Sequence, residues 1–98
     1  MKFDTNQIKQ EIKSFIGNDG LKYFIELYKK NGTVWVAVRD DKLPHSIWFH
    51  EGRQIRNHIG TVFPELYNDI LETYGYNYYE DLIAKLVDEL IKEKIEHD

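Results

Sequence analysis

Apolar residues recur at helical spacing in the first segment of the chain. Four of them follow at i, i+4, i+7 and i+8 and so share one face of a helix over about residues 4–16: Ile8, Ile12, Phe15 and Ile16. Asp4 or Thr5 can cap the start of this helix. The run Gly17-Asn18-Asp19-Gly20 predicts that the helix stops there and that the chain turns.

Two patterns compete over residues 21–41. Leu21, Phe24, Ile25 and Tyr28 have helical spacing, and Asn31-Gly32 can end a helix. Residues 34–38, Val-Trp-Val-Ala-Val, are β-branched and aromatic, which is typical of a strand. An Asn-Gly step between two such segments is the strongest short-range signal for a hairpin. We therefore predict a β-hairpin over about residues 22–39, and a helix over 21–31 remains the alternative.

Three further helices are predicted after a loop at residues 40–44. From Ser46 onward, Trp48, Ile55 and Ile59 repeat at helical intervals, which predicts a helix over 46–59 with Gly52 inside it. A glycine inside a helix costs roughly 1 kcal/mol relative to alanine. Its presence therefore indicates close packing, or a partner that approaches the backbone.

Pro64 suits the first turn of the next short helix, which carries Leu66, Ile70 and Tyr74 on its apolar face and ends before Gly75. Asn77, with Glu80 three residues later, resembles a capping box and opens the last helix. That helix has a wide apolar stripe made of Leu82, Ile83, Leu86, Val87, Leu90, Ile91 and Ile95. The predicted fold is a small, mostly helical α+β single domain over residues 1–98, with an N-terminal helix, a β-hairpin and three C-terminal helices.

Composition narrows the class of protein. The 98 residues are 42% hydrophobic and 14% aromatic, which is enough for a core and argues against disorder. The absence of cysteine excludes disulfides, thiolate metal sites and cysteine nucleophiles. No apolar run approaches the roughly 20 residues that cross a bilayer, and the N-terminal segment does not resemble a signal peptide. We expect a cytoplasmic protein of bacterial or phage origin that does not bind a membrane.

The net charge of −4 is unevenly distributed. Residues 1–60 carry ten Lys/Arg against seven Asp/Glu, whereas residues 61–98 carry three Lys against ten Asp/Glu. The acidic C-terminal part can dock a basic partner, or it can be a solvated face that keeps the protein soluble.

Residues 45–58 concentrate the candidate chemistry, with three of the four histidines. His50-Glu51 is similar to the start of a zinc metalloprotease motif, but the i+4 position that should hold the second ligand is Gln54. His50 and His58 are about 12 Å apart along a helix, too far for one metal. Neither serine lies in a nucleophile motif. We expect no metal, no cofactor and no catalytic residue.

Arg53 and Arg56 are spaced i, i+3 and can form a phosphate-binding strip, which is the nucleic-acid or nucleotide alternative. Arg56 also lies between apolar residues, which favours a buried ion pair. The predicted partner is Asp81 or its neighbour Glu80, and the pair is assigned to Asp81.

A short pattern in residues 46–95 resembles a small bacterial domain family of unknown function. It comprises His50, the Gly-x-x-Ile-Arg-Asn run at 52–57, Gly75 and the acidic pair Glu80-Asp81. Tyr79 stands where the family has proline, and the first 45 residues have no counterpart. The resemblance implies a helical fold and no particular activity.

Tyr74, Tyr76, Tyr78 and Tyr79 crowd the junction of the last two helices, either as a core corner or as a partner surface, since tyrosine is enriched at interfaces. The function predicted from the sequence is non-catalytic binding of another protein, as in immunity proteins of toxins or phage inhibitors of host defence. A second copy of the chain is among the partners considered, and an enzyme ranks third, after nucleic acid. The candidate binding residues are Arg53, His50, His58, Tyr76, Tyr78, Tyr79, Glu80 and Glu89.

Overall fold

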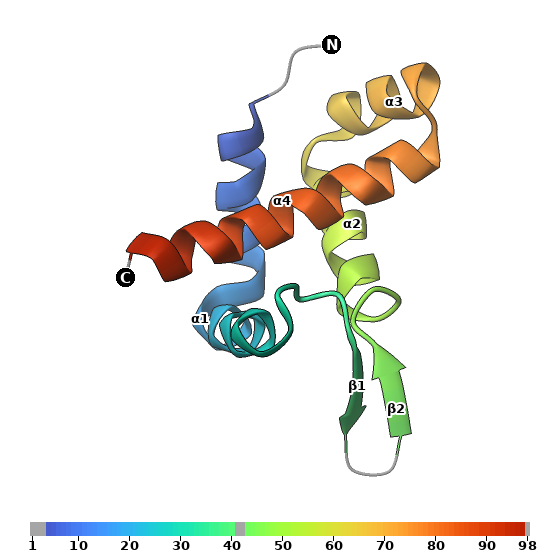
Figure 1. Ribbon diagram of the computed structural model, residues 1–98. Helices are drawn as coiled ribbons and strands as arrows, with labels where there is room; N and C mark the ends of the chain where they lie inside the picture. Colours follow the sequence, from blue (N-terminus) through green and yellow to red (C-terminus); the bar gives the residue numbers. More distant parts are fainter. Residues whose placement is uncertain (1–3, 41–42, 98) are drawn as a thin grey trace.

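The computed structural model describes residues 4–40 and 43–97 (Figure 1). Within these residues the chain forms four helices and one two-stranded sheet, a small, mostly helical α+β fold. In chain order the elements are α1 (Thr5–Asn31), β1 (Ala37–Asp40), β2 (Leu43–Ser46), α2 (Glu51–Val62), α3 (Pro64–Thr73) and α4 (Tyr76–His97).

Helix α1 is bent where the glycine-rich turn was predicted. Asp4 caps its start, since its carboxylate accepts hydrogen bonds from the backbone N–H groups of Asn6 and Gln7. Gly17 has a non-helical conformation with φ 71°, which a residue with a Cβ rarely adopts. The predicted first helix therefore ends at this kink, and a second helical segment continues from it.

The predicted hairpin over residues 22–39 is wrong in position, because residues 21–31 are helical. Leu21 and Phe24 bury their side chains in the core, as the helical spacing alone would place them. Gly32 ends α1 in the left-handed conformation (φ 78°), and its N–H donates a 2.7 Å hydrogen bond to the Tyr28 carbonyl. The Asn31-Gly32 step is thus a helix C-cap and not a hairpin turn.

The hairpin lies farther along the chain, where β1 and β2 pair in antiparallel register from Ala37 opposite Ser46 to Asp40 opposite Leu43. Pro44 is compatible with this strand because the sheet has two strands in the part of the chain that the structure describes, so that β2 is an edge. The loop predicted over 40–44 is therefore replaced at its ends by strands, and residues 41–42 lie outside the described residues.

Helix α2 begins at Glu51, five residues later than predicted, because Ser46 belongs to β2 and residues 47–50 form a turn. Gly52 therefore lies in the first turn of α2 and not in its middle. A Cβ at Gly52 would lie 3.0 Å from Cζ3 of Trp35 and 3.3 Å from the Ile47 carbonyl oxygen. The glycine is needed for this close packing, as one of the two sequence interpretations proposed.

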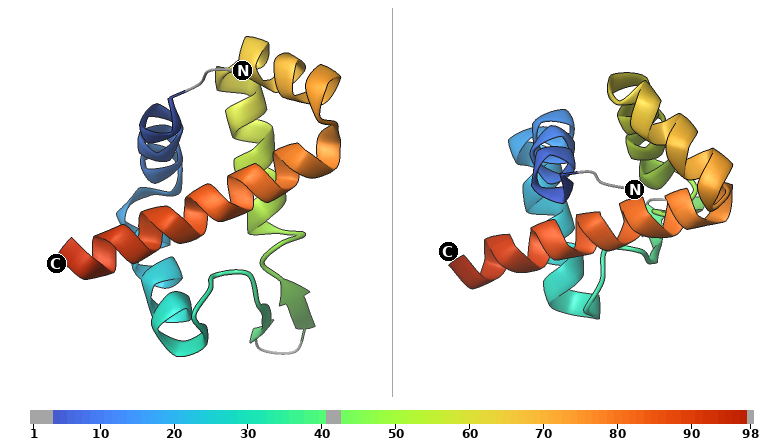
Figure 2. Two further views of the ribbon diagram at one scale, coloured as in Figure 1. Left: turned by 45° about the horizontal axis from the view of Figure 1, so that its top comes forward. Right: turned by 90° about the horizontal axis from the view of Figure 1, so that it is seen from above.

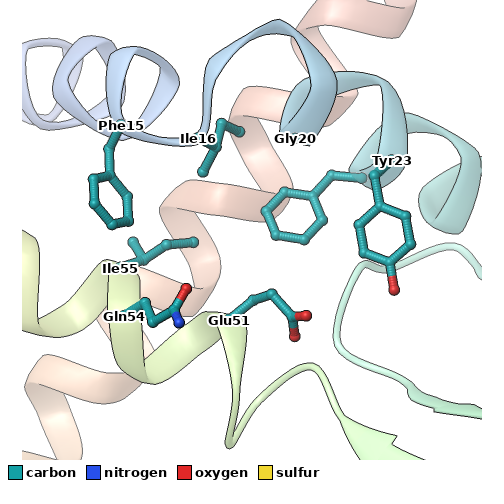
Figure 3. A pocket seen from close by; sticks show the side chains of 8 residues that line it. Phe15, Ile16, Gly20, Tyr23, Glu51, Gln54 and Ile55 are labelled. Carbon is teal, nitrogen blue, oxygen red and sulfur yellow. The ribbon is translucent and has the colours of Figure 1, made fainter. Parts of the chain in front are cut away.

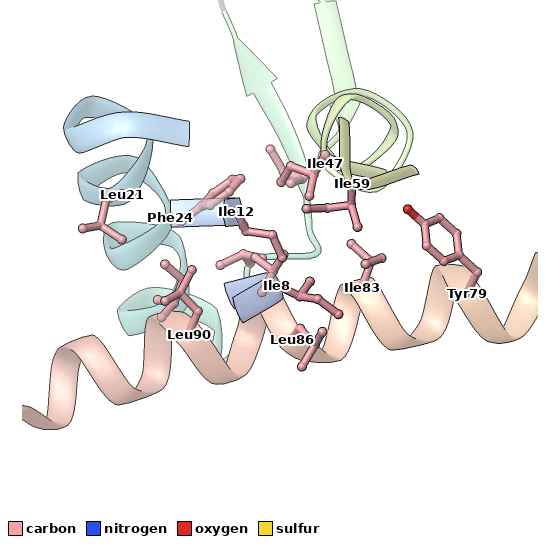
Figure 4. Packing of buried hydrophobic residues seen from close by; sticks show 14 of the residues in the cluster. Ile8, Ile12, Leu21, Phe24, Ile47, Ile59, Tyr79, Ile83, Leu86 and Leu90 are labelled. Atoms are coloured by element: carbon pink, nitrogen blue, oxygen red, sulfur yellow. The ribbon is translucent and has the colours of Figure 1, made fainter. Parts of the chain in front are cut away.

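The last two helices follow the prediction closely. Pro64 begins α3, Gly75 separates it from α4 with φ 91°, and α4 begins at Tyr76, one residue before Asn77. Helix α4 crosses α1 and α2 in Figure 1 and in the left view of Figure 2. Its stripe forms one wall of the core, with Ile83 and Leu90 directed toward side chains of α1 and α2 (Figure 4).

None of the helices in the described residues has an apolar stretch long enough to span a membrane.

Candidate functional site

The histidines of residues 45–58 lie at two ends of α2. His45 in β2 has its Nε2 3.3 Å from Oε1 of Glu51, and its ring meets that of His50 at 5.4 Å between centroids. At the far end, Nε2 of His58 lies 2.9 Å from Oε1 of Glu11, and its ring stacks on Phe15. Among the described residues, no three His, Asp or Glu side chains are placed to hold one metal ion.

Arg56 is a core residue, only 5% exposed. Its Nη2 lies 3.7 Å from Oε2 of Glu80, and its guanidinium carbon lies 4.8 Å from the centre of the Trp48 ring. The predicted pair with Asp81 is therefore wrong, since Glu80 faces the arginine and Asp81 is exposed. Burial also removes Arg56 from the predicted phosphate-binding strip, which leaves Arg53 as the exposed arginine of α2.

Tyr79 was predicted to bind a partner, but it is 1% exposed and belongs to the core. Its hydroxyl donates a 2.6 Å hydrogen bond to the Arg56 carbonyl, and its ring meets Tyr67 edge-on at 4.9 Å. Burial raises the pKa of Tyr79 well above its ordinary value of 10.0, so the hydroxyl stays protonated as a donor.

The other three tyrosines of the cluster are on the surface. Tyr74, Tyr76 and Tyr78 are 50%, 45% and 42% exposed, and we call them the tyrosine corner. Tyr74 and Tyr78 stack on each other with 4.4 Å between ring centroids. The ring of Tyr76 lies 6.2 Å from the buried Tyr79. The corner is thus an exposed aromatic surface that is anchored on the core.

A pocket of about 280 Å³ adjoins this corner through Tyr76. It is lined from α2, α3 and α4 by Arg56, Asn57, Gly60, Thr61, Tyr67, Tyr76 and Tyr79. Tyr76 therefore belongs both to the exposed corner and to a hollow large enough for one side chain of a partner.

The predicted acidic residues divide between structural and exposed roles. Glu80 forms an ion pair with Arg56, and 20% of its side chain is exposed. Glu89 pairs with Nζ of Lys9 at 3.2 Å and still has 41% of its side chain exposed. The stretch of sequence that contains the tyrosine corner carries no basic side chain, because no Lys or Arg occurs between Arg56 and Lys85. The same stretch holds the acids Glu65, Asp69, Glu72, Glu80 and Asp81.

A second pocket, of about 230 Å³, lies between α1 and the start of α2 (Figure 3). Its lining residues are Phe15, Ile16, Gly20, Tyr23, Phe24, Glu51, Gln54 and Ile55. Sequence reasoning did not find it, because its two sides come from segments about 30 residues apart that only the bent α1 brings together. The single local signal was the Gly17–Gly20 turn beside Phe15.

No family model, curated protein or solved structure was found to match this chain.

Proposed function

We propose that this protein acts by non-catalytic binding of another protein, and that the tyrosine corner receives a basic segment of that partner. The observation that carries the proposal is the exposure of Tyr74, Tyr76 and Tyr78, each above 40%, at the junction of α3 and α4. Tyrosine combines a large apolar ring with a polar tip and loses little conformational entropy on binding, which makes it a frequent interface anchor.

The charge around the corner supports a basic partner. The acids Glu65, Asp69, Glu72 and Asp81 are exposed on α3 and α4, in a stretch of sequence without a single Lys or Arg. Complementary charge of this kind accelerates association and disfavours acidic partners. The adjoining pocket adds a hollow in which a partner side chain can be buried, as hot spots are.

In this proposal the protein is a small acidic binder in the cytoplasm, of the kind represented by toxin immunity proteins and phage inhibitors of host defence. The nucleic-acid alternative has lost its main support. It depended on Arg53 and Arg56 acting together, and Arg56 is buried against Trp48 and Glu80.

The test compares the wild type with a triple variant that replaces the tyrosines of the corner by serine (Y74S, Y76S, Y78S). Each protein is immobilised and exposed to an extract of the source cells, and captured proteins are identified by mass spectrometry and then measured individually for affinity. The matched control is F49S, which removes an aromatic side chain that is 66% exposed outside the corner.

We expect one basic protein to bind the wild type and F49S with equal affinity and the triple variant at least about tenfold more weakly. Its affinity should also fall as salt is added, since the charges are exposed. A partner that binds the triple variant as tightly as the wild type would contradict the proposal.

A further inference from the structure

The pocket between α1 and α2 combines apolar walls with one carboxylate. Phe15, Ile16 and Phe24 from α1 and Ile55 from α2 supply the apolar wall. In Figure 3, Phe15 lies toward one end and Tyr23 toward the other, and Gln54 and Glu51 of α2 face α1 across the space. Such a lining, mostly apolar with a few polar groups, is the usual composition of a small-molecule site.

The Glu51 carboxylate is incompletely satisfied. Oε1 lies 3.3 Å from Nε2 of His45, and both that nitrogen and Oε2 are buried without a hydrogen-bond partner among the described residues. A buried carboxylate oxygen without a donor is unfavourable, and a charged donor would correct it better than a neutral one. Glu51 lines the pocket with 25% of its side chain exposed, and rotation about its broad terminal torsion can turn a carboxylate oxygen toward a ligand there.

From this geometry we propose that the pocket binds a small organic amine with an apolar body, whose ammonium group pairs with Glu51. The apolar body would lie among Phe15, Phe24 and Ile55, and the amide oxygen of Gln54 can accept a second hydrogen bond from the ammonium group. An anion is disfavoured by the carboxylate, and a neutral hydrocarbon would leave Oε2 without a donor. The volume of about 230 Å³ is below that of drug-sized pockets, which suits a ligand of one ring and a short chain.

This site is separate from the tyrosine corner and shares no lining residue with it. The amine-binding proposal therefore does not depend on the proposed function, and each can fail without the other.

The experiment is an NMR titration of the full chain, labelled with ¹⁵N, with 2-phenylethylamine. We expect chemical-shift changes concentrated in residues 15–24 and 51–55. The variant E51Q should weaken binding by about tenfold or more, because a charge-assisted hydrogen bond is lost. The matched control E72Q removes the same charge from an exposed position on α3 and should bind as the wild type does.

Two further titrations test the charge of the ligand and the charge of the pocket. The analogue 3-phenylpropionate has the same ring and chain with a carboxylate in place of the amine, and it should not bind. The variant Q54E adds a second carboxylate at an exposed residue and should tighten amine binding. The proposal is overturned if the amine produces no shifts at millimolar concentration, if the carboxylate analogue binds equally well, or if E51Q and Q54E leave the affinity unchanged.

Discussion

The hydroxyl of Tyr79 donates a 2.6 Å hydrogen bond to the backbone carbonyl oxygen of Arg56, which joins the first turns of α4 to the middle of α2. Both residues are buried. In Tyr79→Phe the carbonyl loses this donor, and we expect the free energy of unfolding to fall by about 1–2 kcal/mol in urea denaturation. Tyr74→Phe, at a half-exposed position, should change it by less than about 0.5 kcal/mol. Equal losses in the two variants would show that the bond does not stabilise the fold.

The Arg56–Glu80 pair predicts that the loss of Glu80 lowers the stability of the fold more than the loss of the adjacent Asp81. Removal of Glu80 leaves a buried guanidinium without its carboxylate, so Glu80→Ala should lower the free energy of unfolding by about 2 kcal/mol or more. Asp81→Ala, at an exposed position, should stay within about 0.5 kcal/mol of the wild type. Thermal and urea unfolding of the two variants measures the difference, and the reverse order would restore Asp81 as the partner of Arg56.

Asp88 of α4 fixes the segment between α1 and β1. Its carboxylate accepts a 2.7 Å hydrogen bond from Oγ1 of Thr33 and a 3.0 Å bond from the N–H of Val34, whose side chain is fully buried. Asp88→Ala removes both acceptors and should cost about 2 kcal/mol in the free energy of unfolding. Asp69→Ala, on the exposed face of α3, is the control. If its loss matches that of Asp88→Ala, the two hydrogen bonds contribute nothing measurable.

The ion pair between Lys9 and Glu93 predicts that the protein loses stability at alkaline pH. Its Nζ lies 2.7 Å from Oε1 of Glu93, and this bond raises the pKa of Lys9 above its ordinary value of 10.5, against the opposing effect of burial. Because the folded state holds this proton more tightly than the unfolded chain, the stabilisation is complete below pH 10.5 and is lost as the pH rises through the folded-state pKa.

The measurement is urea denaturation on either side of pH 10.5 for the wild type and for Lys9→Met, which keeps the apolar stem. The wild type should lose more stability than Lys9→Met on crossing that pH, and exposed Lys13→Met should behave as the wild type does. Burial of Tyr79 adds a loss of the same sign to all three proteins, so the difference isolates Lys9. If Lys9→Met loses as much as the wild type, the ion pair does not hold the proton.

The sequence pattern predicted an element correctly where the residues of that element give one unambiguous local signal. The stripe on α4 and the positions of Pro64 and Gly75 predicted the last two helices to within one residue. It failed where two local signals competed. Asn31-Gly32 fits both a hairpin turn and a helix end. The helix forms because it buries Leu21 and Phe24 on one face in the core.

The candidate site was less predictable because it depends on how helices are rotated relative to one another. Neighbours on a helix point about 100° apart, so only one of Glu80 and Asp81 can face Arg56, and the sequence does not say which. Tyr78 and Tyr79 divide in the same way between surface and core. The α1–α2 pocket needs the bend at Gly17, whose effect on distant residues cannot be read locally.

The most extensive helix contact in the described residues joins α1 to α4, and Lys9 reaches Glu93 across 84 positions of sequence. During translation, a nascent chain that has reached only Gly75 contains the sequence of α1, the hairpin, α2 and α3 but lacks the wall that covers Ile8 and Ile12. The core can close only after α4 has left the ribosome. Until then these apolar faces are open to chaperones and to other nascent chains.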